Sequence, residues 1–250
     1  MRRLRRYARV ARVLGVVSLG LGMAGMFGLL ERLGLNSTMD RRQRWSQFFM
    51  TRLSNALPFR VTVHGELPQT PMLWVSNHVS WTDIPLLGMV APMSFLSKAE
   101  VRTWPVAGWL AAKAGSLFIR RGSGDSQLIR KQMTRHLEQA HPLLMFPEGT
   151  TTDGSHVLGF HAALLQPAIE AGAPIQPLAL CYRLPDGRFT RAPAYDGDVS
   201  LLDCLKAIVA EREIVARIHV APALSTTEQP DRKQLSQRAR DTIVERIANC

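Results

Sequence analysis

Cysteine is scarce in this 250-residue sequence, and its pattern limits what the chain can be. The three cysteines lie far apart, and no two of them have the spacing of zinc ligands. An odd number of cysteines argues against a disulfide framework, so we expect reduced thiols in a domain that faces the cytoplasm. These cysteines are Cys181, Cys204 and Cys250.

Lysine is also scarce, so arginine carries most of the positive charge. The formal net charge is +11 and the isoelectric point is near 10.5. A chain this basic can bind nucleic acid, an anionic membrane surface or an acidic carrier protein. The sequence has no RNA-binding aromatic motif, no Cys/His finger and no basic-zipper pattern. Because the arginines crowd near the N-terminus beside an apolar run, we predict a membrane partner and no nucleic acid.

The N-terminal segment predicts a helical membrane anchor. Arginines are frequent in residues 1–12, and residues 13–30 contain no charge. A helix needs about 17–25 apolar residues to span a bilayer, so this run is just long enough. Residues 41–57 place aromatic side chains at near-helical spacing among arginines, which is typical either of an interfacial amphipathic helix or of a core helix.

From residue 59 onward, predicted strands and helices alternate. This alternation predicts an α/β fold with a largely parallel or mixed sheet flanked by helices. We expect anchoring helices over residues 1–57 and the α/β domain over 58–250. The predicted strands are 60–63, 72–76, 94–97, 116–119, 143–146, 175–182 and 215–220. The predicted helices are 82–89, 105–112, 126–140, 161–171, 201–210 and 231–248.

Residues 77–83, NHVSWTD, follow a predicted buried strand and precede a predicted helix. Ligands of α/β sheets bind in the crevice beyond the carboxyl ends of strands. His78 and Asp83 would lie about 140° apart on one regular helix, so they meet only if the chain turns between them. A carboxylate bonded to one imidazole nitrogen fixes the tautomer and leaves the other nitrogen as a base. For a bare His-x4-Asp the more frequent outcome is that His78 caps a loop and Asp83 caps a helix.

A second motif, FPEGT at residues 146–150, follows another apolar strand. Gly149 can adopt backbone angles that other residues resist, and such a loop can direct N–H groups at an anion. The two motifs together resemble those of the glycerolipid acyltransferase family, typified by 1-acylglycerol-3-phosphate O-acyltransferase. GSLFIRR at 115–121 and APIQPLAL at 173–180 resemble the second and fourth blocks of that family, so the resemblance spans roughly residues 60 to 220.

The resemblance implies which side chains carry the chemistry. His78 would be the general base and Asp83 its orienting partner. Arg121 matches the family's phosphate-binding arginine, with Arg120 as a second candidate. Glu148 would orient an arginine or bind substrate. Further side chains are expected to shape or reach the substrate pocket: Asn77, Ser80, Gly149, Thr150 and Lys98.

The implied reaction is direct acyl transfer from acyl carrier protein or acyl-CoA to the free hydroxyl of a lysolipid, without cofactor or metal. No serine or cysteine lies in a G-x-S-x-G motif, so we expect no covalent acyl-enzyme. Acyl donors are cytoplasmic, and both flanks of the apolar run are basic. We therefore predict a monotopic anchor on the cytoplasmic face of the inner membrane.

The acceptor stays open at this point. The first-ranked acceptor is 1-acylglycerol 3-phosphate, which would give phosphatidic acid for phospholipid biosynthesis. Many phosphatidate-forming members carry an acidic residue before the block-two arginine, and here that position holds Arg120. NHVSWTD, and TTDG after Glu148-Gly149, also resemble the lyso-ornithine lipid acyltransferase branch. A lipid hydrolase that uses the same His/Asp pair and a non-enzymatic basic protein would also fit parts of the sequence.

Overall fold

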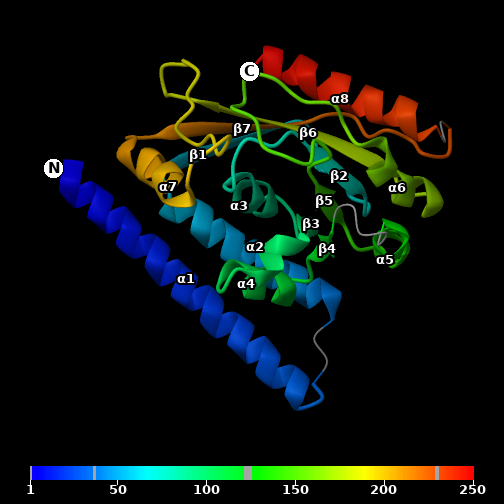
Figure 1. Cartoon of the computed structure of the whole chain (residues 1–250), viewed down its shortest axis with the longest axis horizontal. Helices are drawn as coiled ribbons and strands as arrows, with labels where there is room; N and C mark the ends of the chain where they lie inside the picture. Colours follow the sequence, from blue (N-terminus) through cyan, green and yellow to red (C-terminus); the bar gives the residue numbers. More distant parts are fainter. Residues whose placement is uncertain (1, 36–37, 121–125, 229–230) are drawn as a thin grey trace.

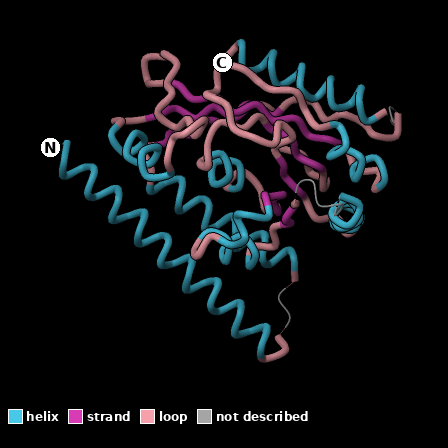
Figure 2. Tube along the Cα trace, in the orientation of Figure 1, coloured by secondary structure: helices cyan, strands magenta, loops and turns pink. Residues whose placement is uncertain are grey.

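The computed structural model describes residues 2–35, 38–120, 126–228 and 231–250, and within them one mixed β-sheet has helices on both faces (Figures 1 and 2). The sheet order is β1-β7-β6-β2-β5-β3-β4, and only β6 and β7 pair antiparallel. The α/β prediction is confirmed, and each predicted strand forms. The strands are β1 Phe59–His64, β2 Leu73–Ser76, β3 Ser94–Lys98, β4 Leu117–Ile119, β5 Leu143–Met145, β6 Ile175–Arg183 and β7 Ile214–Val220.

The central strands are buried on both sides, as apolar runs in a largely parallel sheet should be. Every residue of β2 and β5 is buried. Side chains alternate between two cores: Trp74 packs in one, while Leu73 and Val75 pack in the other. The first core lies under α3 Asp83–Gly88 and α7 Leu201–Ala210, and the second lies under α5 Ser126–Glu138, α6 Gln166–Glu170 and α8 Arg232–Ala248.

The remaining helical segments differ in small ways from the prediction. A short helix, α4 Ala107–Lys113, follows the 3-10 turn η1 Ala99–Thr103. The helix predicted over 161–171 is divided into the 3-10 turn η2 Ala162–Leu165 and α6. Pro167 lies in the first turn of α6, where its missing N–H costs nothing, so a new helix begins there.

Two N-terminal helices, α1 Arg2–Arg32 and α2 Met39–Ala56, pack together along the first core (Figure 1). Gly20 lets α1 approach closely, because a Cβ there would overlap the ring of Phe49. Glu31 at the end of α1 forms ion pairs with Arg42 of α2 and Lys113 of α4. Within the described residues, 3–32 form the one helix that is long and apolar enough to cross a membrane. A domain boundary at residue 57 stays a prediction.

The expectation of three reduced cysteines is wrong for two of them. Cys181 on β6 and Cys250, just after α8, form a disulfide with their Cα atoms 6.6 Å apart. The two residues are 69 positions apart, and they meet because α8 packs back across β6. The spacing of the cysteines in the sequence therefore could not predict this disulfide. Cys204 on α7 is a free, buried thiol.

We predict that acid destabilises the fold through His136 of α5. Burial, followed by the neighbouring His141, lowers the pKa of His136 to about 4. The unfolded chain takes up this proton below its ordinary pKa of 6.5, and the folded chain does so only near pH 4. Lowering the pH from 7 to 4 should therefore cost about 3 kcal/mol of unfolding free energy from this group.

Denaturant unfolding at both pH values measures this loss. His136→Gln should lack this part of the pH-dependent loss of unfolding free energy, and His156→Gln, which removes an exposed ring, should keep it. An equal pH dependence in wild type and His136→Gln would contradict the assignment.

Candidate active site

The two sequence motifs meet at one edge of the sheet. β2 and β5 are parallel neighbours with Val75 opposite Met145, so the chain leaves both strands at the same edge. His78 follows β2, and the loop of residues 146–150 follows β5. This is the crevice beyond the carboxyl ends of parallel strands, where α/β folds bind ligands.

His78 and Asp83 are in direct contact. Nδ1 of His78 lies 2.7 Å from Oδ2 of Asp83, whose side chain is fully buried while that of His78 is 19% exposed. The turn that this contact requires ends where α3 begins, and the N–H of Asp83 donates to the carbonyl of Ser80 at 3.1 Å. Because Nδ1 is engaged by the carboxylate, Nε2 is the imidazole nitrogen left to act as a base.

The Asp83 carboxylate accepts three further hydrogen bonds. The backbone N–H groups of Val79 and Ser80 donate to Oδ2 at 2.7 and 2.9 Å, and the hydroxyl of Tyr182 donates to Oδ1 at 2.5 Å. Hydrogen bonds of this kind stabilise a charged carboxylate in a buried position. Asp83 is therefore held in one orientation, and it holds the imidazole in turn.

Phe146 and Glu148 hold His78 from the side of β5. The Phe146 ring stacks on the imidazole with centroids 3.9 Å apart. One oxygen of Glu148 accepts the backbone N–H of His78 at 2.8 Å, and the other accepts that of Leu158 at 2.7 Å. Burial raises the pKa of Glu148, and these two N–H donors oppose that shift. Glu148 thus positions the His78 backbone, and its contact with substrate stays a prediction.

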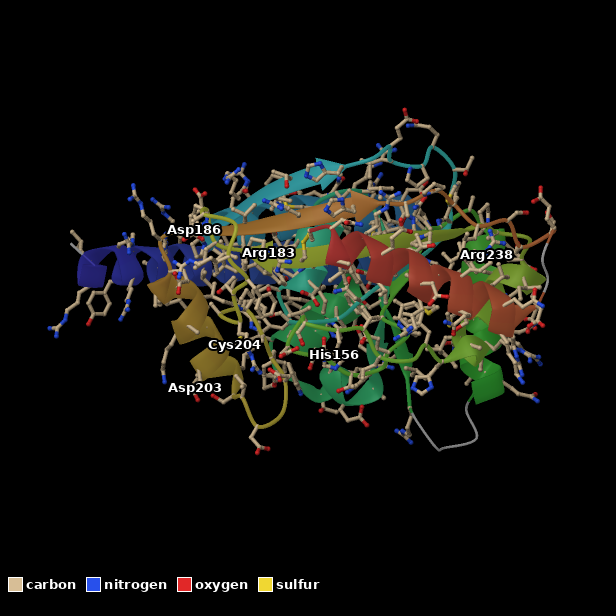
Figure 3. The ribbon with its side chains drawn as sticks, turned by 90° about the horizontal axis from the view of Figure 1, so that it is seen from above. His156, Arg183, Asp186, Asp203, Cys204 and Arg238 are labelled. Atoms are coloured by element: carbon tan, nitrogen blue, oxygen red, sulfur yellow. A yellow bond between two sulfur atoms is a disulfide. The ribbon has the colours of Figure 1, made fainter. Side chains whose placement is uncertain are left out.

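Asn77 and Ser80 also hold the chain around His78. The Asn77 side chain exchanges two hydrogen bonds with the backbone of Leu180 on β6, at 2.9 and 2.8 Å. The Ser80 hydroxyl accepts the N–H of Thr82 at 3.2 Å and lies 4.0 Å from the sulfur of Cys204, which Figure 3 labels on α7. Both side chains are buried, so they set the shape of the loop.

The other predicted residues that the structure describes lie at the same edge of the sheet. Gly149 has φ +72°, a conformation that favours glycine, and Thr150 beside it is exposed. Lys98 ends β3 and pairs with Ile119 of β4, so exposed Lys98 and Arg120 share this edge. At about 4.8 Å per strand, β3 and β4 lie roughly 10 and 14 Å from β2. Arg121 lies outside the described residues.

Tyr182 is a site residue that sequence reasoning missed. Its side chain is 2% exposed, and it contacts both Asp83 and the hydroxyl of Thr82, at 3.2 Å. Burial, and then the charge of Asp83, raises the pKa of Tyr182 well above its ordinary value, so the phenol stays protonated and donates. The contact joins residues 99 positions apart, and no local pattern pairs them.

Comparison with known proteins assigns the family. A family model described as Acyltransferase matches residues 60–181. A lyso-ornithine lipid O-acyltransferase from Pseudomonas aeruginosa is 48% identical over 243 residues, which cover 97% of this chain and 93% of the relative. This chain belongs to the acyltransferase family.

The acyltransferase is also similar to a 1-acyl-sn-glycerol-3-phosphate acyltransferase from Neisseria meningitidis. The two are 36% identical over 191 residues, which cover 75% of this chain and 74% of the relative. The crystal structure of PlsC, the 1-acyl-sn-glycerophosphate acyltransferase of Thermotoga maritima, matches all of this chain and 97% of its own, with a TM-score of 0.71 at 20% identity. This likeness shows that the fold is shared.

We predict that Tyr182→Phe lowers kcat of the acyltransferase by about 10- to 100-fold, because one hydrogen bond to a buried charge contributes about 1.5–3 kcal/mol. KM should change little if Tyr182 touches Asp83 and no substrate. Steady-state kinetics measure both quantities.

Tyr195→Phe is the matched control. It removes a phenol hydroxyl from a residue whose backbone N–H, which the change keeps, donates to the carbonyl of Val79. If Tyr182→Phe lowered kcat no more than Tyr195→Phe does, Tyr182 would have a packing role alone.

Proposed function

We propose that this acyltransferase moves a fatty acyl group from an acyl carrier protein or CoA thioester to the free hydroxyl of a lysolipid, with His78 as general base. The observation that carries the proposal is the 2.7 Å contact between the imidazole and the buried Asp83. It supports an imidazole with Nδ1 engaged, Nε2 facing the crevice and a fixed negative charge behind the ring.

Nε2 of His78 takes the proton of the acceptor hydroxyl while the oxygen of that hydroxyl forms a bond to the thioester carbonyl carbon. The tetrahedral intermediate then collapses, the carbon–sulfur bond breaks, and the imidazolium returns its proton to the leaving thiolate. Asp83 stabilises the imidazolium that forms in between. General-base catalysis of this kind contributes about 10²–10⁴ in rate.

Basic residues at the same edge suit an anionic part of either substrate. Lys98 and Arg120 are exposed at the same edge of the sheet, two and three strands from β2, and Arg121 follows directly in the chain. A guanidinium binds two oxygens of a phosphate or carboxylate at once, which a lysine does not. We assign these side chains to the lysolipid headgroup or to the phosphates of the donor.

Two acceptors are favoured by separate observations. The 48% identity to a lyso-ornithine lipid O-acyltransferase extends over nearly the whole chain and supports an ornithine headgroup, as does Arg120 in place of an acidic residue. The 36% identity to a 1-acyl-sn-glycerol-3-phosphate acyltransferase supports the phosphate headgroup that the sequence ranked first. We propose lyso-ornithine lipid as the preferred acceptor and 1-acylglycerol 3-phosphate as the second candidate.

We propose that the N-terminal helices attach the protein to the cytoplasmic face of the inner membrane without crossing it. Arg9 of α1 donates to the carbonyls of Val209 and Arg212 at the end of α7, at 3.1 and 2.7 Å, so the basic end of α1 is joined to the domain. A hollow of about 500 Å³ between α1 and α4 is bordered by exposed Leu29 and Trp109. More apolar side chains are exposed along these segments: Leu14, Leu19, Met26, Leu33, Trp104 and Val106.

We predict that His78→Ala lowers acyl transfer by at least about 10²-fold, because the general base is lost. The assay supplies labelled acyl thioester with lyso-ornithine lipid or 1-acylglycerol 3-phosphate and follows the acylated product. His156→Ala, which removes an exposed ring from the loop after β5, should keep full activity. Circular dichroism verifies that both variants fold.

Three results would change the proposal. If His78→Ala acylated the lysolipid at the wild-type rate, His78 would not be the general base. Faster acylation of 1-acylglycerol 3-phosphate would reverse the order of the two acceptors. Free fatty acid released without any lysolipid would favour a hydrolase.

We predict that charges on the outer face of α1 release the protein from vesicles. The double variant Leu19→Asp/Met26→Asp places carboxylates on side chains that are exposed in the structure, so its vesicle-bound fraction should fall several-fold. The control is Leu128→Asp, which changes a more exposed leucine on α5, the helix that covers part of the second core. Flotation with anionic vesicles measures the fraction, and equal flotation of the double variant and wild type would contradict an α1 anchor.

A further inference from the structure

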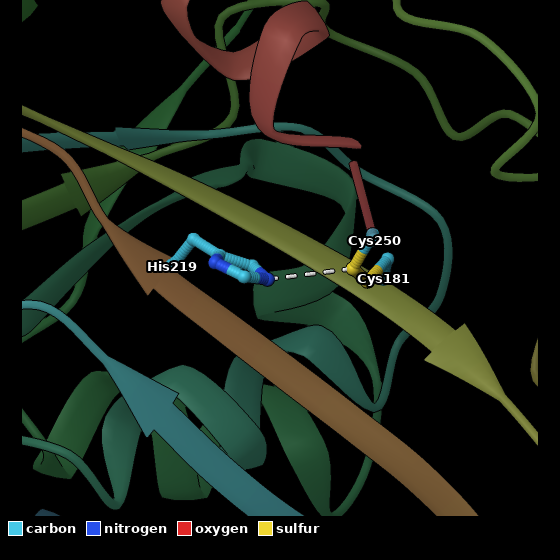
Figure 4. A group of neighbouring side chains, drawn as sticks. All are labelled: Cys181, His219 and Cys250. Atoms are coloured by element: carbon cyan, nitrogen blue, oxygen red, sulfur yellow. Dashed lines mark hydrogen bonds between the residues drawn. A yellow bond between two sulfur atoms is a disulfide. The ribbon is translucent and has the colours of Figure 1, made fainter. Parts of the chain in front are cut away.

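A cluster of sulfur and imidazole groups lies on the face of the sheet that α8 covers. Cys181 is on β6, His219 is on β7, and Cys250 follows α8. One potential ligand atom from each lies within 4.8 Å of the other two (Figure 4). None of these side chains takes part in the acyl-transfer site.

The sheet register places these groups on one face. β6 and β7 pair antiparallel with Ala179 opposite His219 and Cys181 opposite Arg217. Cys181 and His219 are therefore diagonal neighbours, whose side chains point to the same side of the sheet. α8 packs over β6 through Leu235, Ala239 and Ile243, and the turn after it brings Cys250 to the pair.

We propose that the reduced form of this cluster is a Zn²⁺ site, with the two cysteine thiolates and the His219 imidazole as ligands. Thiolate and imidazole are the preferred zinc ligands, and zinc sites with three protein ligands keep a fourth position open. Nε2 of His219 lies 3.5 Å from Sγ of Cys250. With Zn–S of about 2.3 Å and Zn–N of about 2.0 Å, a tetrahedral site requires about 3.5 Å between these two atoms.

The disulfide is the metal-free, oxidised form of the same site. A dithiol reductant converts it: one thiolate attacks a cysteine sulfur, the S–S bond breaks, and the second thiolate resolves the mixed disulfide. Two electrons pass from the dithiol to the cystine, which leaves two protein thiols and an oxidised dithiol. Zn²⁺ then displaces both thiol protons and forms two Zn–S bonds and one Zn–N bond. Cytoplasmic reductants keep such thiols reduced.

This change needs side-chain movements around the cluster. The two sulfurs must separate to about 3.8 Å to occupy adjacent corners of a zinc tetrahedron. Cys250 lies beyond the last turn of α8 and is half-buried, so its side chain can turn without altering the sheet. Cys181 and His219 stay on their strands.

The charges around the cluster explain why both cysteines are needed. Arg217 donates to the backbone carbonyl of Cys250, and the charges of Arg217 and Arg246 act on His219. The His64 ring also stacks on that of His219, with centroids 4.8 Å apart. Against this basic surrounding, a divalent cation needs two negative ligands for neutrality, and a single thiolate leaves a net positive charge.

The test uses the full-length protein in detergent. One sample is reduced with a phosphine, freed of reductant and titrated with Zn²⁺, while an oxidised sample is titrated in parallel. A chromogenic chelator reports affinity, and Co²⁺ substitution reports thiolate ligation through charge-transfer absorption. We expect one Zn²⁺ per reduced chain, none in the oxidised chain, and affinity lowered at least about tenfold by Cys250→Ser, Cys181→Ser or His219→Ala.

Cys204→Ser is the matched control, because it removes the buried thiol of α7 and leaves the cluster intact. The wild-type comparison of reduced and oxidised protein needs no substitution, so it holds even if Cys181→Ser fails to fold. The proposal is overturned if the reduced wild type binds no more Zn²⁺ than the oxidised protein. It is also overturned if Cys250→Ser binds Zn²⁺ as tightly as the wild type.

Discussion

The fixed position of one buried carboxylate, that of Asp83, determines the geometry of the acyl-transfer site. Three elements converge on it: the turn of residues 78–80, the first turn of α3 and the phenol of Tyr182 on β6. A buried charge without such partners would cost several kcal/mol, so the surrounding structure has to supply them. The imidazole orientation is therefore a property of the whole sheet edge.

Much of the fold was predictable, because its strands are short apolar runs between turns. All the predicted strands form, since period and burial are local properties of a segment. The helix at 161–171 was less accurate, because Pro167 starts a new helix inside an apolar pattern that continues across it. The choice between a parallel and a mixed sheet stayed open for a different reason. It depends on the antiparallel pairing of β6 and β7, and the sequence of either strand alone does not indicate its partner or its direction.

The contacts of the active site also divide into local ones, which the sequence predicted, and long-range ones, which it did not. The meeting of His78 and Asp83 could be inferred from the motif, because a five-residue spacing with a turn is a local constraint. The contacts of Glu148 with the backbone of His78 and of Tyr182 with Asp83 span 70 and 99 residues and arise only from strand order. The Cys181–Cys250 disulfide belongs to this second class.

β6 carries consecutive residues with different tasks. Leu180 accepts and donates hydrogen bonds with Asn77, and Tyr182 binds Asp83, both on the side of the first core. Cys181 between them faces α8. Adjacent residues of a strand point to opposite faces, so the sulfur chemistry of Cys181 and the support of Asp83 by Tyr182 lie on opposite sides of one backbone. Because Cys250 can turn without altering the sheet, a change in the bonding partner of Cys181 leaves the hydrogen bond of Tyr182 to Asp83 in place.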